Sequence, residues 1–159
     1  MHSPRSDVIQ RGSNSEIVTL RFPDDPNETW LDQTDCPWDS VSADVAKDWH
    51  NPDIWASKTV PIPGNAAEIT LPENTVVFVS GCSFIATSES PYGVINIPAT
   101  SSLIFLDSNI VLHTRGLNVM GILEIGSSTC RLRSTVNIVL HGNRADHDES
   151  AFAHKGIYV

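Results

Sequence analysis

The chain has 159 residues, which suits one domain of ordinary size with a flanking segment. Its 19 acidic residues outnumber its 10 Lys and Arg, and the formal net charge is −9. Nucleic-acid binding needs clustered Lys and Arg to neutralise phosphates, so this charge excludes nucleic acid as the expected partner. No run of 18 apolar residues is present, and we expect no membrane insertion by this segment.

Residues 1–35 are rich in Pro, Asp, Asn and Ser, which predicts an extended lead-in. One alternating run, residues 17–22, could form a strand. The first residues lack the apolar core of a signal peptide, so we expect no signal peptide in this chain. The tripeptide Asn27-Glu28-Thr29 has the sequence of an N-glycosylation site, which fits a glycoprotein.

Residues 36–55 carry most of the tryptophans and form a second segment. Val41, Val45 and Trp49 recur every four residues and would share one apolar face of a helix. We therefore predict a short amphipathic helix at about 40–49, ended by the Asn-Pro pair that follows. Its apolar face is expected to cap one end of the β part.

From Val60 onward, short apolar and β-branched runs alternate with Gly, Pro, Asn, Asp or Ser. The expected strands have four or five residues each, too few for long hairpins. They are residues 68–71, 75–79, 83–86, 94–97, 103–106, 110–113, 117–120, 122–125 and 136–140.

Two of these segments recur later in the chain. Residues 93–97 resemble residues 116–120 at an offset of 23, and residues 103–106 resemble residues 122–125 at an offset of 19. A repeat of about 20 residues made of short strands is what one turn of a solenoid requires. We therefore predict a mainly β fold, a right-handed parallel β-helix (single-stranded solenoid) capped by the N-terminal helix. A β-sandwich of short strands is the alternative.

Specific motifs add a family resemblance. The run Val60-Pro61-Ile62-Pro63-Gly64 opens the pattern, and Leu123-Glu124-Ile125-Gly126-Ser127 is followed by Ile138-Val139-Leu140-His141-Gly142. With these motifs, about residues 50–159 resemble the eight-glycine domain of fibrocystin-like and cell-surface or secreted hyaluronidase-like proteins. Glycines that match the pattern are expected at coil corners, where they tolerate left-handed backbone angles. They are Gly64, Gly93, Gly116, Gly121, Gly126 and Gly142.

These patterns divide the chain into three parts. Residues 1–35 are the lead-in, residues 36–55 the Trp-bearing helix or cap, and residues 56–159 the eight-glycine-type β-helical domain. The final residues have the pattern of an interrupted strand, so we expect the domain to be truncated at its C-terminal end.

The three cysteines, Cys36, Cys82 and Cys130, match no zinc-binding spacing. Buried free thiols are one interpretation, because cysteine is often buried. The other is a single disulfide with one thiol unpaired or bound outside the chain, for which we favour Cys36–Cys130.

Ionisable side chains cluster near the C-terminal end. His141, His147 and Asp146 are candidates for acid–base catalysis, since imidazole titrates near neutral pH and paired carboxylates hydrolyse glycosides. Asp146, Asp148 and Glu149 could offer oxygen ligands to Ca²⁺, although EF-hand spacing is missing. A solvated acidic loop is the simpler interpretation, so no cofactor is assigned.

Candidate binding residues lie in both halves of the chain. Trp30 and Trp38 could stack on sugar rings. Arg144 begins an Arg-Ala-Asp core in a region whose counterpart has been linked to activity in hyaluronan-degrading relatives. For His113 we expect a corner histidine bonded to backbone rather than a ligand.

The resemblance implies an extracellular protein or the ectodomain of a membrane protein, with an extracellular glycan or protein as its ligand. Our first hypothesis is a non-catalytic binding or structural module of a larger cell-surface or secreted protein. The alternative is a fragment of a calcium-dependent hyaluronan or glycan depolymerase, acting as a glycan hydrolase.

Overall fold

A computed structural model describes residues 15–20, 36–142 and 156–159. This part of the chain is mainly β, with one short 3-10 turn, η1 (Pro52–Ile54), and no helix long and apolar enough to cross a membrane. The strands are β1 (Ser15–Leu20), β2 (Ala46–Asp48), β3 (Ile69–Thr70), β4 (Val76–Val79), β5 (Tyr92–Ile97), β6 (Ser102–Phe105), β7 (Ile110–Val119), β8 (Ile122–Ile125), β9 (Val136–His141) and β10 (Ile157–Tyr158).

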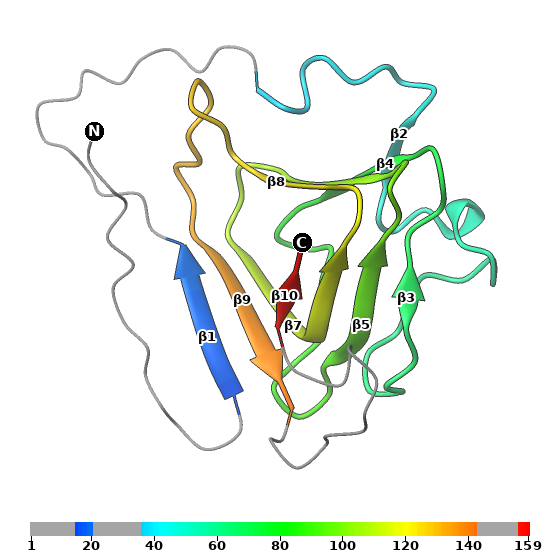
Figure 1. The fold of residues 1–159 in the computed structure, drawn as a ribbon, viewed down its shortest axis with the longest axis vertical. Coiled ribbons are helices and arrows are strands. Elements are labelled where there is room, and N and C mark those ends of the chain that lie inside the picture. Colours follow the sequence, from blue (N-terminus) through cyan, green and yellow to red (C-terminus); the bar gives the residue numbers. More distant parts are fainter. Residues whose placement is uncertain (1–14, 21–35, 143–155) are drawn as a thin grey trace, which may run out of the picture.

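From β2 to β9, successive strands alternate between two sheets, and each pairs in parallel with the next strand of its own sheet (Figure 1). One sheet has the order β2-β4-β6-β8, and the other contains β9-β7-β5-β3. Parallel neighbours joined through an opposite sheet form a β-helix, here with four turns across the first sheet. The β-sandwich alternative is wrong, because antiparallel pairing is found in the described part only between β1 and β9.

The turns of the coil differ in length. The register places 30 residues between β2 and β4, 26 between β4 and β6, and 20 between β6 and β8. In the other sheet, Ile95 pairs with Leu117 at an offset of 22 residues. The sequence repeats have offsets of 23 and 19 residues, whereas the strands pair at offsets of 22 and 20, so each repeat differs from the register by one residue. A one-residue slip exchanges the two faces of a strand.

Stacked columns of apolar side chains fill the coil. Ile69, Ile95 and Leu117 form one column and are all buried. In the facing sheet, Val77 and Leu103 stack in the same way and are fully enclosed. Such columns follow from parallel, in-register stacking, because each inward side chain lies about 4.8 Å from its equivalent in the next turn.

The helix predicted at about 40–49 is wrong. This segment contains turns and then β2, which pairs with β4, and the Trp49 amide continues the ladder by donating to the Phe78 carbonyl at 3.2 Å. Trp49 thereby enters the column above Val79 and is fully buried, whereas Val45 is exposed. The spacing of four was coincidental, because backbone pairing with β4 outweighs a weak helical pattern.

Aromatic side chains from this segment pack together in the core. The Trp49 ring meets Trp55 and Phe84 edge to face, at centroid distances of 4.9 and 5.0 Å. At the other side of the molecule, β1 lies antiparallel beside β9 and covers its outer edge (Figure 1). The strand expected at 17–22 therefore exists as β1, and it protects a sheet edge that would otherwise invite pairing.

The family glycines have two different roles. Gly64 and Gly126 have positive φ values of 90° and 69°, as expected of corners. Gly93 and Gly121 instead allow neighbouring turns to approach, since a Cβ would lie 1.9 Å from the Ala67 carbonyl oxygen at Gly93 and 2.1 Å from that of Pro98 at Gly121. The expectation of left-handed corners is therefore wrong for this second pair, where the constraint is steric, and for Gly116, which lies within β7 and has no positive φ.

Candidate functional site

An insertion interrupts the last turn of the coil. Thr114 of β7 pairs with Leu140. Leu117, three positions later in β7, pairs with Ile157, which is seventeen positions after Leu140. The segment between β9 and β10 is residues 142–156, of which residues 143–155 lie outside the described residues. Figure 1 shows both strands beside β7.

Most of the predicted site residues belong to this insertion and lie outside the described residues. They are Arg144, Asp146, His147, Asp148 and Glu149, and the binding candidate Trp30 also lies outside them. Their catalytic, calcium-binding and ligand-binding roles remain predictions. His141 is described, and it is the last coil residue before the insertion.

His141 is paired with His113. The Nδ1 atom of His113 lies 2.9 Å from the Nε2 atom of His141, and the ring centroids are 5.1 Å apart with an angle of 36° between the planes. One nitrogen must donate and the other accept, so the two atoms share a single proton between them. Both side chains are half-buried on the outer face of the sheet.

The pair was not predicted as a unit. His113 lies within β7 opposite Val139, rather than at a corner, and its ring bonds to another side chain. Residues 113 and 141 are 28 positions apart, close to the 26-residue spacing between β7 and β9. The spacing of the two histidines was the signal in the sequence that they lie side by side. It could be recognised only once the length of this turn was known.

Burial controls the charge of His113. Desolvation of the half-buried imidazole lowers the pKa of His113 below its usual value of 6.5, because the cation loses hydration that the neutral ring does not need. His113 is therefore predominantly neutral at pH 7. A neutral imidazole keeps a lone pair that can accept a proton or bind a metal ion.

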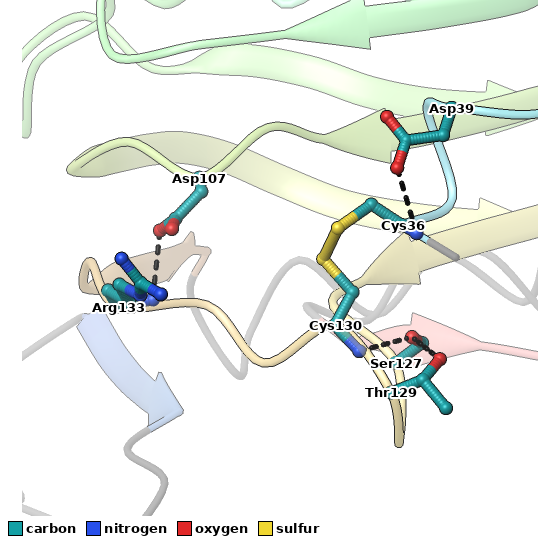
Figure 2. The surroundings of a disulfide bond; sticks show 7 residues. All are labelled: Cys36, Asp39, Asp107, Ser127, Thr129, Cys130 and Arg133. Atoms are coloured by element: carbon teal, nitrogen blue, oxygen red, sulfur yellow. Dashed lines mark hydrogen bonds between the residues drawn. A yellow bond between two sulfur atoms is a disulfide. The ribbon is translucent and has the colours of Figure 1, made fainter. Parts of the chain in front are cut away.

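A disulfide joins Cys36, which precedes the coil, to Cys130 in the loop after β8 (Figure 2). This is the pair favoured from the sequence. The Cys130 amide donates to Ser127 Oγ at 2.9 Å, and the Cys36 amide donates to Asp39 Oδ2 at 3.2 Å. The bond therefore fastens the segment before β2 to the last turns of the coil, 94 residues away in sequence.

Further bonds hold the same loop. Asp107 Oδ1 accepts from the backbone amides of Arg133 and Ser134, at 2.9 and 3.0 Å, and from the Ser134 hydroxyl. Figure 2 shows Asp107 and Arg133 in the same region as the disulfide. Cys82 is an exposed free thiol in a turn after β4. Trp38 is half-buried and packs against the core, which leaves only part of its ring available to a ligand.

A row of polar side chains runs across the outer face of β3, β5 and β7. The Asn118 amide donates to Asn96 Oδ1 at 3.1 Å, and the Asn96 amide donates to Glu68 Oε2 at 3.2 Å. Register pairing places Thr70, Asn96 and Asn118 in one outward column. We call Asn96 and Asn118 the asparagine column. Its amide groups provide hydrogen-bond donors and acceptors one strand spacing apart.

Together these features define a disulfide-braced parallel β-helix domain with a polar outer face. Residues 54–159 match the model of the G8 domain, and the chain therefore belongs to the G8 domain family. The resemblance to the eight-glycine domain is confirmed. No solved structure matches the chain.

The similar curated proteins come from Dictyostelium discoideum. Two G8 domain-containing proteins are 38% identical over 148 residues and 37% identical over 159 residues, covering 92% and 99% of this chain. Communication mutant protein F is 36% identical over 149 residues. The chain spans only 10%, 14% and 13% of the lengths of these three proteins.

Proposed function

We propose that this chain is a non-catalytic, extracellular binding or structural module of a larger cell-surface or secreted protein. The observation that carries the proposal is the disulfide between Cys36 and Cys130. Disulfides persist in oxidising compartments and are rare in the reducing cytosol. The small share of each relative that the chain covers supports a module within a longer protein.

The proposed ligand is an extracellular glycan or a protein, and the asparagine column supports the glycan. Sugars present many hydroxyl groups, which amide side chains can bind both as donors and as acceptors. Asn96 and Asn118 lie half-exposed in adjacent turns, at a spacing of about 4.8 Å. We also propose that the parent protein is related to fibrocystin-like or hyaluronidase-like proteins.

The enzyme alternative is a calcium-dependent hyaluronan depolymerase with Asp146 at its site. Glycoside hydrolysis needs two carboxyl groups on either side of the scissile bond. Among the described residues, His, Cys, Asp and Glu form no group of three or more that could hold a metal ion. We favour the module because the disulfide and the hydrogen-bonded Asn96 and Asn118 on the outer face support it.

A paired experiment separates the two functions. The isolated chain is tested on immobilised glycans, and the full-length parent is incubated with hyaluronan and calcium while the polymer size is followed. The module predicts glycan binding that the double substitution Asn96→Ala, Asn118→Ala weakens, with unchanged polymer size. Depolymerisation that Asp146→Asn abolishes in a folded protein would establish the enzyme instead.

A further inference from the structure

We propose that His113 and His141 form a binding site for a divalent transition-metal ion on the outer face of β7 and β9. The site consists of His113 Nδ1 and His141 Nε2, with water completing the coordination. It is independent of the ligand proposed for the module. The chemical class is set by imidazole, which suits Zn²⁺, Cu²⁺ and Ni²⁺ rather than Ca²⁺ or Mg²⁺.

The distance between the two nitrogens supports this site. They are 2.9 Å apart and point toward one another across a shared proton. With metal–nitrogen bonds of about 2.0–2.1 Å, two ligands at right angles lie about 2.9 Å apart, and two tetrahedral ligands lie about 3.3–3.4 Å apart. A metal ion can therefore replace the proton if each ring turns until its nitrogen lone pair points about 35–45° off the line between the two nitrogens, with at most about 0.5 Å of added separation.

The backbone holds both ligands in place. His113 lies within β7 and His141 ends β9, and these strands pair in parallel from Ile110 to Thr114. The other edge of β9 is paired with β1, whose Ser15 lies opposite His141. A site on paired strands keeps its geometry better than one on a loop, so little order must be gained on metal binding.

The local charges are compatible with a cation. Arg115 carries a positive charge two residues after His113 in β7, but its side chain is exposed, and water and salt screen its effect. The net charge of −9 on the whole chain attracts cations to its surface.

The test is titration of the full chain with Cu²⁺, since this ion binds most tightly to a given nitrogen site. Isothermal calorimetry gives the affinity, and electron paramagnetic resonance counts the coordinating nitrogens. His113→Gln and His141→Gln are each expected to weaken binding at least tenfold and to remove one nitrogen from the spectrum. His50→Gln is the matched control, because His50 is exposed and bonded to Asp48, and it should leave the affinity unchanged.

A second measurement uses the unaltered chain and so does not depend on the variants folding. Added Zn²⁺ should shift the imidazole nitrogen resonances of two histidines together, at a stoichiometry of one ion per chain. The proposal is overturned if Cu²⁺ binds the His113→Gln and His141→Gln variants as tightly as the parent chain. It is equally overturned if Zn²⁺ leaves both of these rings in their metal-free state.

Discussion

Single residues in this domain carry constraints that their types alone do not reveal. The family glycines illustrate this, because the expected role, a left-handed corner, applies at Gly126. At Gly93 the constraint comes from a backbone carbonyl in another turn of the coil. A sequence shows that a glycine is present, but the atom that would collide with a side chain is visible only after the turns are stacked.

The steric role of Gly93 predicts the effect of adding one methyl group. Gly93→Ala should lower the free energy of unfolding by about 2 kcal/mol or more, because the new Cβ would lie 1.9 Å from the Ala67 carbonyl oxygen. Gly116→Ala is the control, with its nearest contact at 3.2 Å, and should cost less. Urea denaturation of both variants checks the difference, and equal losses would contradict the close approach at Gly93.

Tyr92 gives a prediction for alkaline pH. Burial raises the pKa of Tyr92 above its ordinary value of 10.0, since the core disfavours the phenolate. The unfolded chain therefore releases this proton first, so stability is full below pH 10 and falls as pH rises through the folded pKa. Denaturation between pH 8 and 11 should show this loss, and Tyr92→Phe should reduce it. A slope unchanged by Tyr92→Phe would mean that the ring is not buried as described.

Elements were predictable where the side-chain pattern alone decides them. Most of the short strands after Val60 and the parallel coil could be inferred, because β-branched runs separated by turn residues have few other solutions. The strand expected at 83–86 is wrong, since these residues form a turn and loop, and the strands expected at 110–113 and 117–120 are one strand, β7. The segment around Trp49 could not, since a three-residue strand carries too little pattern to outweigh a chance spacing of four. The exact lengths of the turns could not be predicted from the sequence either. The contact between His113 and His141 depends on those lengths, so it could not be predicted.

The two interpretations of residues 40–49 predict different mutational effects. In the structure, Trp49 is fully buried and Val45 is exposed. Trp49→Ala should therefore cost about 3–5 kcal/mol of unfolding free energy, and Val45→Ala about 0.5 kcal/mol or less. A helix packed through Val41, Val45 and Trp49 would instead make both substitutions costly. Thermal and urea denaturation of the two variants decide between them.

At the scale of the whole molecule, one disulfide closes a loop that contains most of the coil. Cys36 and Cys130 are 94 residues apart, and closing so long a loop restricts the unfolded chain strongly. From the loop-closure entropy of a loop of this length, the double variant Cys36→Ser, Cys130→Ser should lose up to about 4–5 kcal/mol of unfolding free energy. Cys82→Ser is the matched control, because this thiol is exposed, and it should leave stability nearly unchanged.

The most direct test of the account is the state of the three thiols in the native protein, isolated without reducing agent. The unreduced protein is alkylated, digested and examined by mass spectrometry. A disulfide-braced extracellular module predicts a linked peptide pair containing Cys36 and Cys130, with alkylation at Cys82. Alkylation of all three cysteines before reduction, or a disulfide through Cys82, would contradict the Cys36–Cys130 bond and the extracellular location proposed from it.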